Sequence, residues 1–175
     1  MRRSLAGLAL IRREASGHTG YLVQWNANWQ RFSLVGGNKH DDESFRECLI
    51  RELFEELGLH VESDLQVSDQ PIARAEYTCW SESAKQHTRY ELELFDITVF
   101  TPVAMQQIND NRLNRWVSIE EIGHSRCDDG RPIDGSVERL LQQAGLPAPR
   151  PPSAARSIHA TEKVGFAADM YDTII

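Results

Sequence analysis

The stretch from Gly37 to Leu59 reads GNKHDDESFRECLIRELFEELGL, and the fold and chemistry of the chain are inferred outward from it. Its glutamates Glu52, Glu55 and Glu56 stand at i, i+3 and i+4. At about 100° per residue on an α-helix, their carboxylates share one arc of the helix surface. Neighbouring like charges repel one another. The pattern therefore indicates either a solvated acidic face or a cation site, and oxygen ligands of this kind suit Mg²⁺ or Mn²⁺.

Residues around the glutamates predict where their helix begins and ends. Ser44 followed by Glu47 has the form of a capping box, in which each side chain satisfies a backbone N–H at the helix start. Gly58 is suited to a left-handed cap at the helix end. One side of the helix is apolar and should face a core, through Phe45, Leu49, Ile50, Leu53, Phe54 and Leu57. Glu47 and Arg51 are spaced for an i, i+4 ion pair.

The same segment resembles the Nudix box at every defining position. Five residues separate Gly37 from Glu43, and seven more lead to the Arg-Glu pair, the Glu pair, the second glycine and the aliphatic positions. These later positions are Arg51, Glu52, Leu53, Glu55, Glu56, Gly58 and Leu59. The resemblance implies an α/β fold, a Nudix-like α/β/α sandwich with a mixed β-sheet between helices. One departure precedes the box, where Val35 stands at a position often held by proline.

The resemblance also implies a role for each box residue. Glu52, Glu55 and Glu56 are expected as ligands of Mg²⁺ or Mn²⁺, together with the backbone carbonyl of Gly37. Arg51 is expected to orient the glutamates by salt bridges. The implied reaction is attack of water on one phosphorus of a diphosphate linkage.

The general base of that reaction stays open. Glu52 or Glu55 within the box has the right chemistry. Acids outside the box are the alternatives: Glu82, Glu91, Glu93 and Asp128.

The expected substrate is a small nucleoside diphosphate derivative, and two residues outside the box are candidates to contact it. Trp29 precedes the box in a loop, where an exposed ring stacks on a nucleobase. Arg74 falls in a strand pattern and has the geometry to bind a phosphate. A solvated or paired arginine is the alternative interpretation, and Trp25 is expected in the core.

Composition narrows the possible partners. The 175 residues are 41% hydrophobic, with a formal net charge of −7. An acidic chain lacks the net basic surface that non-specific nucleic-acid binding needs, so no nucleic-acid partner is expected. No apolar run approaches the length of a membrane span. Three widely spaced cysteines, Cys48, Cys79 and Cys127, indicate reduced thiols and a cytoplasmic location.

Two further kinds of function remain as alternatives. A nucleotide-binding sensor that has lost hydrolysis would be expected to lack a box glutamate, and none is missing. An isomerase acting on a diphosphate would need a cysteine near the metal, for which Cys79 is the candidate.

Outside the box, the pattern predicts strands on both sides of one central helix. Strands are expected at residues 4–12, 21–25, 32–35, 71–80, 89–100 and 113–118, and an irregular stretch from Val61. Ser118 with Glu121 forms a second capping-box pattern, and apolar spacing predicts a helix over 134–144.

Residues 1–146 are expected to form the Nudix hydrolase domain, and residues 147–175 a Pro-rich linker and C-terminal arm. The stretch LPAPRPPSAARS holds four of the seven prolines, which favours a semi-extended segment. Three placements of the arm stay open: packing on its own domain, docking on a second subunit in a homodimer, or disorder.

Overall fold

A computed structural model describes residues 2–81 and 84–146 of the chain. The C-terminal arm at 147–175 and Glu82 lie outside the described residues. The strands are β1 (Arg2–Ala15), β2 (His18–Asn26), β3 (Arg31–Ser33), β4 (Gly36–Asn38), β5 (Leu65–Val67), β6 (Ala73–Ser81), β7 (Gln86–Val99) and β8 (Asn114–Val117). The helices are α1 (Phe45–Leu57), α2 (Pro102–Asp110), α3 (Ile119–Gly123) and α4 (Gly135–Gln143).

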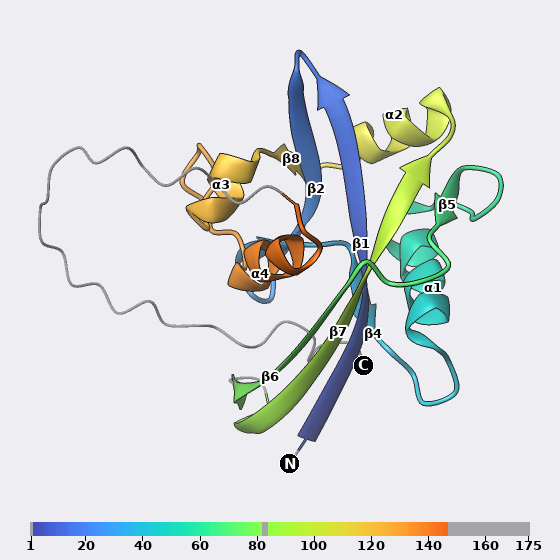
Figure 1. The fold of residues 1–175 in the computed structure, drawn as a ribbon. Helices are drawn as coiled ribbons and strands as arrows, with labels where there is room; N and C mark the ends of the chain where they lie inside the picture. Colours follow the sequence, from blue (N-terminus) through green and yellow to red (C-terminus); the bar gives the residue numbers. More distant parts are fainter. Residues whose placement is uncertain (1, 82–83, 147–175) are drawn as a thin grey trace, which may run out of the picture.

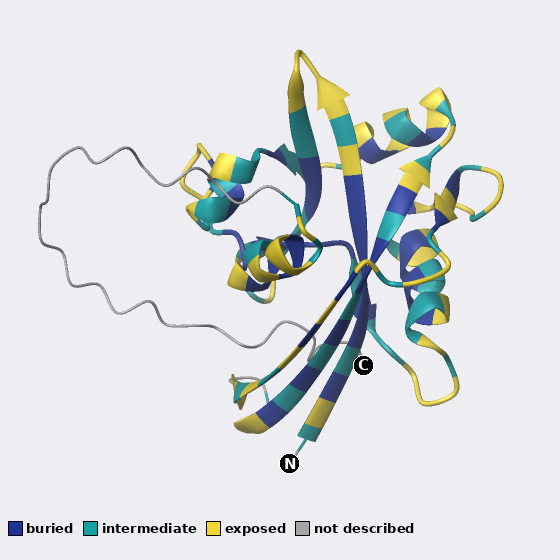
Figure 2. Cartoon of the chain, in the orientation of Figure 1, coloured by how far each residue is buried: buried dark blue, intermediate teal, exposed yellow. Residues whose placement is uncertain are grey.

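Strand β1 organises the sheet. It pairs in parallel with β7, and antiparallel with β4 near its middle and with β2 at its end. The path runs β3-β2-β1-β7-β5, with β6 beside β7 and β8 beside β2. A strand covered on both faces reads as a continuous apolar run, and β1 is buried without interruption from Ala6 to Ile11 (Figure 2).

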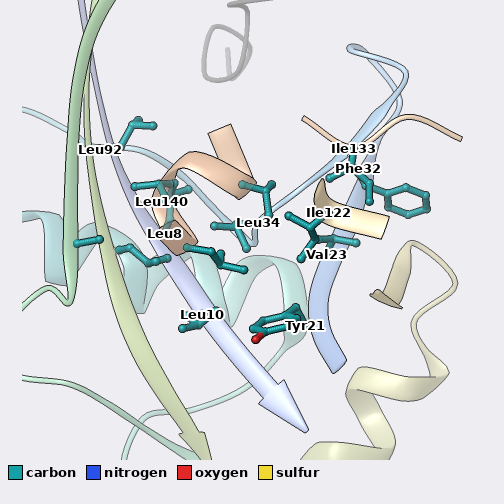
Figure 3. Packing of buried hydrophobic residues seen from close by; sticks show 14 of the residues in the cluster. Leu8, Leu10, Tyr21, Val23, Phe32, Leu34, Leu92, Ile122, Ile133 and Leu140 are labelled. Carbon is teal, nitrogen blue, oxygen red and sulfur yellow. The ribbon is translucent and has the colours of Figure 1, made fainter. Parts of the chain in front are cut away.

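Two hydrophobic cores lie on opposite faces of this sheet. Leu8 and Leu10 belong to one core, which includes Leu140 of α4 and Ile122 of α3 (Figure 3). Ala9 and Ile11, the alternate residues of the same strand, belong to the other core, with α1 and α2. Figure 1 shows the helices on these two sides of β1. The predicted α/β/α sandwich with a mixed sheet is confirmed.

Helix α1 begins and ends at the predicted residues. Ser44 and Glu47 form both bonds of the capping box, and Gly58 closes the helix with φ +67°. Two details of the prediction were wrong. Phe54 is 53% exposed and lies beside His60 instead of entering the core. Arg51 pairs with Glu43, Glu52 and Glu55 instead of Glu47, whose carboxylate is used in the cap.

The helix lies very close to the β1–β4 pair, and Gly7 permits this approach. A Cβ placed on Gly7 would overlap the carbonyl oxygen of Phe45 and press on Leu49. Gly7 faces Gly37 across the β1–β4 ladder. The absence of side chains at this pair therefore seats α1 against the loop that precedes it.

Several elements were not expected from the sequence. Helix α2 lies where no element was predicted, and its N-cap Thr101 accepts a bond from the N–H of Ala104. Strand β5 falls in the stretch expected to be irregular, and pairs with β7. The glycine-rich β4 follows Val35 and pairs with β1. Within the described part of the chain, no helix has the length and apolar character needed to cross a bilayer.

Candidate active site

Arg51 is the hub of the acidic face of α1. Its guanidinium donates to Glu43 at 2.8 Å, to Glu52 at 2.6 Å and to Glu55 at 3.3 Å. It also donates to the carbonyl of Asn38 at 3.0 Å, which ties the helix to β4. The bonds to Glu43 and then Glu52 raise the pKa of Arg51, so it stays charged. Arg51 therefore contacts Glu43, Glu52 and Glu55 at once, and its role in orienting the metal-binding glutamates stays a prediction.

Glu52 is buried against the backbone of Gly37. Its side chain is 2% exposed, and a Cβ on Gly37 would overlap its carboxylate. Burial raises the pKa of Glu52, and Arg51 opposes this shift. A glycine is therefore required at position 37, because the Glu52 carboxylate occupies the space that a Cβ would need. The sequence spacing alone did not reveal this contact. Its carbonyl accepts a bond from the Cys48 thiol, with Sγ and O 3.2 Å apart.

Glu56 takes a different partner, the loop residue Gly36. The Gly36 N–H donates to Glu56 Oε2 at 3.0 Å. Burial raises the pKa of Glu56 to about 7, the Gly36 bond partly offsets this, and the neighbouring charges of Glu52 and Glu55 add to it. Glu56 is therefore the box carboxylate whose charge is least compensated by the protein, since no described cation pairs with it.

The carboxylates of Glu52, Glu55 and Glu56 suit a hard divalent cation, although they do not converge on one point. Among residues 2–81 and 84–146, no three acidic, His or Cys side chains form a ready metal cage. The reason is visible in the contacts: Arg51 holds Glu52 and Glu55, while Gly36 holds Glu56. Glu55 is 49% exposed, and its bond to Arg51 is the longest of the three that Arg51 makes to glutamates. Burial raises the pKa of Glu52 and Glu56, and both carboxylates lie beside a backbone loop, where Mg²⁺ or Mn²⁺ would compensate their charge.

A cavity of about 220 Å³ opens beside Glu56. Gly36 and Glu56 line it together with Trp25, Trp29 and the strand residues Gln24 and Ser33. Asn26 holds the Trp29 loop, because its Oδ1 accepts from the N–H groups of Asn28 and Trp29. The structure thus brings Trp29 to the same cavity as a box glutamate.

Arg74 is placed elsewhere. It pairs with Glu93 at 2.9 Å across β6 and β7, and its side chain is 68% exposed. Two cavities that it lines among the described residues contain none of Glu52, Glu55 and Glu56. The paired-arginine interpretation is the one that the contacts favour.

The described acids considered as a general base outside the box are all engaged by arginines. Glu91 contacts Arg3 and Arg89, and Glu93 contacts Arg74. Asp128 contacts Arg115 in the loop after α3. None of these three acids lines the cavity at Glu56.

Cys79 is remote from the glutamates. It pairs with Thr88, which pairs with Arg2 of β1, whereas Gly37 pairs with Gly7. Five residues of extended strand span about 17 Å. Cys79 is therefore poorly placed for chemistry at the acidic face of α1.

Cys48 is expected to be inert in the native protein. Burial raises the pKa of its thiol to about 12, so almost no thiolate forms at pH 8. We predict that an aromatic disulfide reagent leaves Cys48 unmodified until the chain is unfolded in guanidinium, as measured by peptide mass mapping. The half-buried Cys79 serves as the internal comparison. Rapid native modification of Cys48 would contradict its buried position.

Comparison with known proteins agrees with this fold. The C. elegans Ap4A hydrolase has a TM-score of 0.57 at 16% identity, with 83% of this chain and 97% of that chain covered. A NUDIX hydrolase from Nitrosomonas europaea has a TM-score of 0.52 at 18% identity, with 85% of this chain and 93% of that chain covered. NrtR of Shewanella oneidensis, solved with a 27mer DNA, has a TM-score of 0.55 at 15% identity. The match covers 80% of this chain and 59% of that chain. A search of curated proteins finds no match.

The sandwich fold and the complete box define a hydrolase that acts on pyrophosphate bonds. The model of the NUDIX domain matches residues 1–141. The chain belongs to the NUDIX domain family.

Proposed function

We propose that the chain is a metal-dependent pyrophosphohydrolase that cleaves a nucleoside diphosphate linked to a further group. The observation that carries this proposal is the position of Glu56, which lines a cavity with two tryptophans and has no cationic partner among the described residues. A metal-binding carboxylate next to an aromatic wall suits a ligand that is a phosphate at one end and a flat ring at the other.

Glu52, Glu55 and Glu56 would hold Mg²⁺ or Mn²⁺ beside a loop carbonyl. For that carbonyl we propose Gly37, whose oxygen keeps a second lone pair beside the bond from Cys48, with the adjacent Gly36 as the alternative. The Gly36 N–H donates to Glu56, so Gly36 lies beside this carboxylate. The bound cation would neutralise phosphate oxygens and lower the pKa of the attacking water.

The protein side chains would orient the carboxylates and take the proton of the attacking water. Arg51 fixes the Glu52 carboxylate and restrains Glu55. Glu55, exposed and held by a single long bond, is the box residue best able to turn toward a water and accept its proton. Trp29 would stack on the base, whereas Arg74 stays a prediction with no support from its contacts.

Two alternatives have less support. A sensor without hydrolysis is disfavoured because each box glutamate is present. An isomerase is disfavoured because Cys79 lies several strand residues from the box loop. We also propose a cytoplasmic location, supported by three cysteines without a disulfide. Residues 147–175, as an arm or a dimer contact, remain a proposal from composition alone.

The test is a screen of diphosphate compounds with Mg²⁺ or Mn²⁺, read by mass spectrometry. It would include nucleotide sugars, ADP-ribose, dinucleoside polyphosphates such as Ap4A, and nucleoside triphosphates. Cleavage into two phosphate-bearing products, lost in excess chelator, is the expected result. An isomer of unchanged mass would support the isomerase, and binding without products would support the sensor. Full turnover with metal verified as absent would overturn the metal-dependent mechanism.

A further inference from the structure

The orientation of the Gln24 side-chain amide is set by Asn114, whose own amide is oriented by the backbone carbonyl of Ile108. Asn114 Nδ2 donates to the carbonyl of Ile108 at 2.9 Å. A carbonyl only accepts, so Asn114 must turn its amide nitrogen toward Ile108 and its oxygen the other way. That oxygen accepts from Gln24 Nε2 at 3.0 Å. One N–H of the Gln24 amide is therefore used, which leaves its carbonyl oxygen Oε1 and its second N–H.

These remaining polar groups belong to the cavity at Glu56. Gln24 lines that cavity, while Asn114, which takes the nitrogen, does not. No hydrogen bond to Gln24 Oε1 occurs within residues 2–81 and 84–146. Gln24 thus offers its acceptor oxygen, together with the second N–H of the same amide, to a ligand of this cavity.

Other polar groups of the cavity wall have different roles. Asn26 Oδ1 is already used by the N–H groups of Asn28 and Trp29. Ser33 stands opposite Gln24 in the β2–β3 ladder, but a hydroxyl rotates and can either donate or accept. Glu56 is assigned to the cation. Gln24 is left as the wall residue whose side-chain oxygen would accept from a donor on the ligand.

The rest of the wall favours a flat ring. Trp25 and Trp29 line the cavity, and Arg131 packs over the Trp25 ring with its guanidinium carbon 5.5 Å from the centroid. Trp25 also contacts Phe32 edge-on, at 5.1 Å between centroids. These contacts pack the Trp25 ring on the face of β2 that carries Val23, opposite to that of Gln24. Trp29, in the loop after β2, is the other aromatic residue of the cavity, and an aromatic ring favours stacking of a heterocycle.

We propose that Gln24 is a specificity-determining residue that accepts a hydrogen bond from the amino group of an aminopurine nucleotide. The inference rests on the proposed function for the role of Glu56 and deepens it by naming the class of base. A purine without an amino group would leave Gln24 Oε1 desolvated and unpaired, and that loss is the source of discrimination.

Binding of nucleoside monophosphates to the full-length chain tests this without any turnover. Two pairs are compared by calorimetry: AMP with purine riboside monophosphate, and GMP with IMP. Each pair differs by one amino group. In the pair whose amino group reaches Gln24, the amino nucleotide should bind about tenfold more tightly, as expected for one neutral hydrogen bond.

Variants at Gln24 and Asn114 distinguish a loss of base recognition from a loss of folding. Gln24→Met should bring that ratio close to one, because it removes the acceptor at similar volume. Asn114→Leu leaves Gln24 in place but free to turn, and should weaken the preference. Melting curves of each variant verify folding.

Equal binding within both pairs by the wild-type chain would overturn the inference, as would a preference that survives in Gln24→Met, or no binding of any monophosphate at millimolar concentration. The proposed function and the role of Gln24 are contradicted by different results. Selective binding without any diphosphate cleavage in the screen contradicts the proposed function alone. Cleavage of nucleoside diphosphates with equal binding of both pairs contradicts the role of Gln24 alone.

Discussion

Replacing Glu56 with glutamine is expected to lower the rate of diphosphate hydrolysis on the order of 10³-fold, as loss of one group that stabilises developing charge does elsewhere. The variant should stay folded, because glutamine has the same shape and its side-chain oxygen can still accept from the Gly36 N–H. What is lost is the charge that would bind the cation. Steady-state rates at saturating Mg²⁺, with circular dichroism for folding, measure both effects.

Glu47→Gln on the same helix is the matched control. Glutamine at this position still completes a capping box, so both the helix and the rate should persist. Glu55→Gln should also lower the rate, through loss of a proton acceptor, with less effect on metal affinity. Wild-type turnover in Glu56→Gln would show that the cation, or the reaction, lies away from this carboxylate.

The stability of the metal-free protein is expected to fall as pH rises from 5 to 8. In the folded chain the pKa of Glu56 is raised to about 7, against an ordinary value of 4.5. The stabilising contribution is therefore complete below the unfolded pKa and is lost as pH passes through the folded pKa. At 1.36 kcal/mol per pKa unit, and allowing for partial exposure, the loss is about 1–3 kcal/mol. Glu43, with its pKa lowered to about 2 by Arg51, stays ionised across this range.

Saturating Mg²⁺ or Mn²⁺ should reverse this trend, because the cation binds the ionised native site and stabilises it by mass action. The metal-induced rise in melting temperature should thus be larger at pH 8 than at pH 5. Glu56→Gln should shrink the difference, and its metal-free form should melt higher than wild type at pH 8. Thermal melts at both pH values, with metal and with chelator, measure these shifts. An equal metal-induced shift at the two pH values would show that the cation is bound elsewhere.

Local signals in the sequence were sufficient for helix α1 and for most strands. The capping box at Ser44 and the left-handed cap at Gly58 depend on neighbouring residues only, so their positions were predicted correctly. The apolar pattern also predicted β1 as a strand, and its continuous run is explained by a core on each face. Helix α2 was missed, although Thr101 followed by Pro102 is a recognisable start signal.

Contacts between distant segments account for what the sequence analysis missed. The exposure of Phe54 and the choice of Glu43 by Arg51 depend on where β4 and the loop after α1 lie. Trp29 and Arg74 were equal candidates from the sequence, and only the folded chain separates them, one beside Glu56 and the other paired with Glu93. Gln24 carried no sequence signal at all, because its amide is oriented by Asn114, 90 residues away.

The sequence by itself determined the family, the carboxylates and the helix that carries them, because spacing of 3.6 residues per turn and local caps are written in consecutive residues. The tertiary structure decided which loop residue meets each carboxylate, which aromatic ring shares their cavity, and which amide atom faces it. These depend on the close approach of α1 to the glycine pair of β1 and β4, and on strand register. Both are set by packing between segments that are far apart along the chain.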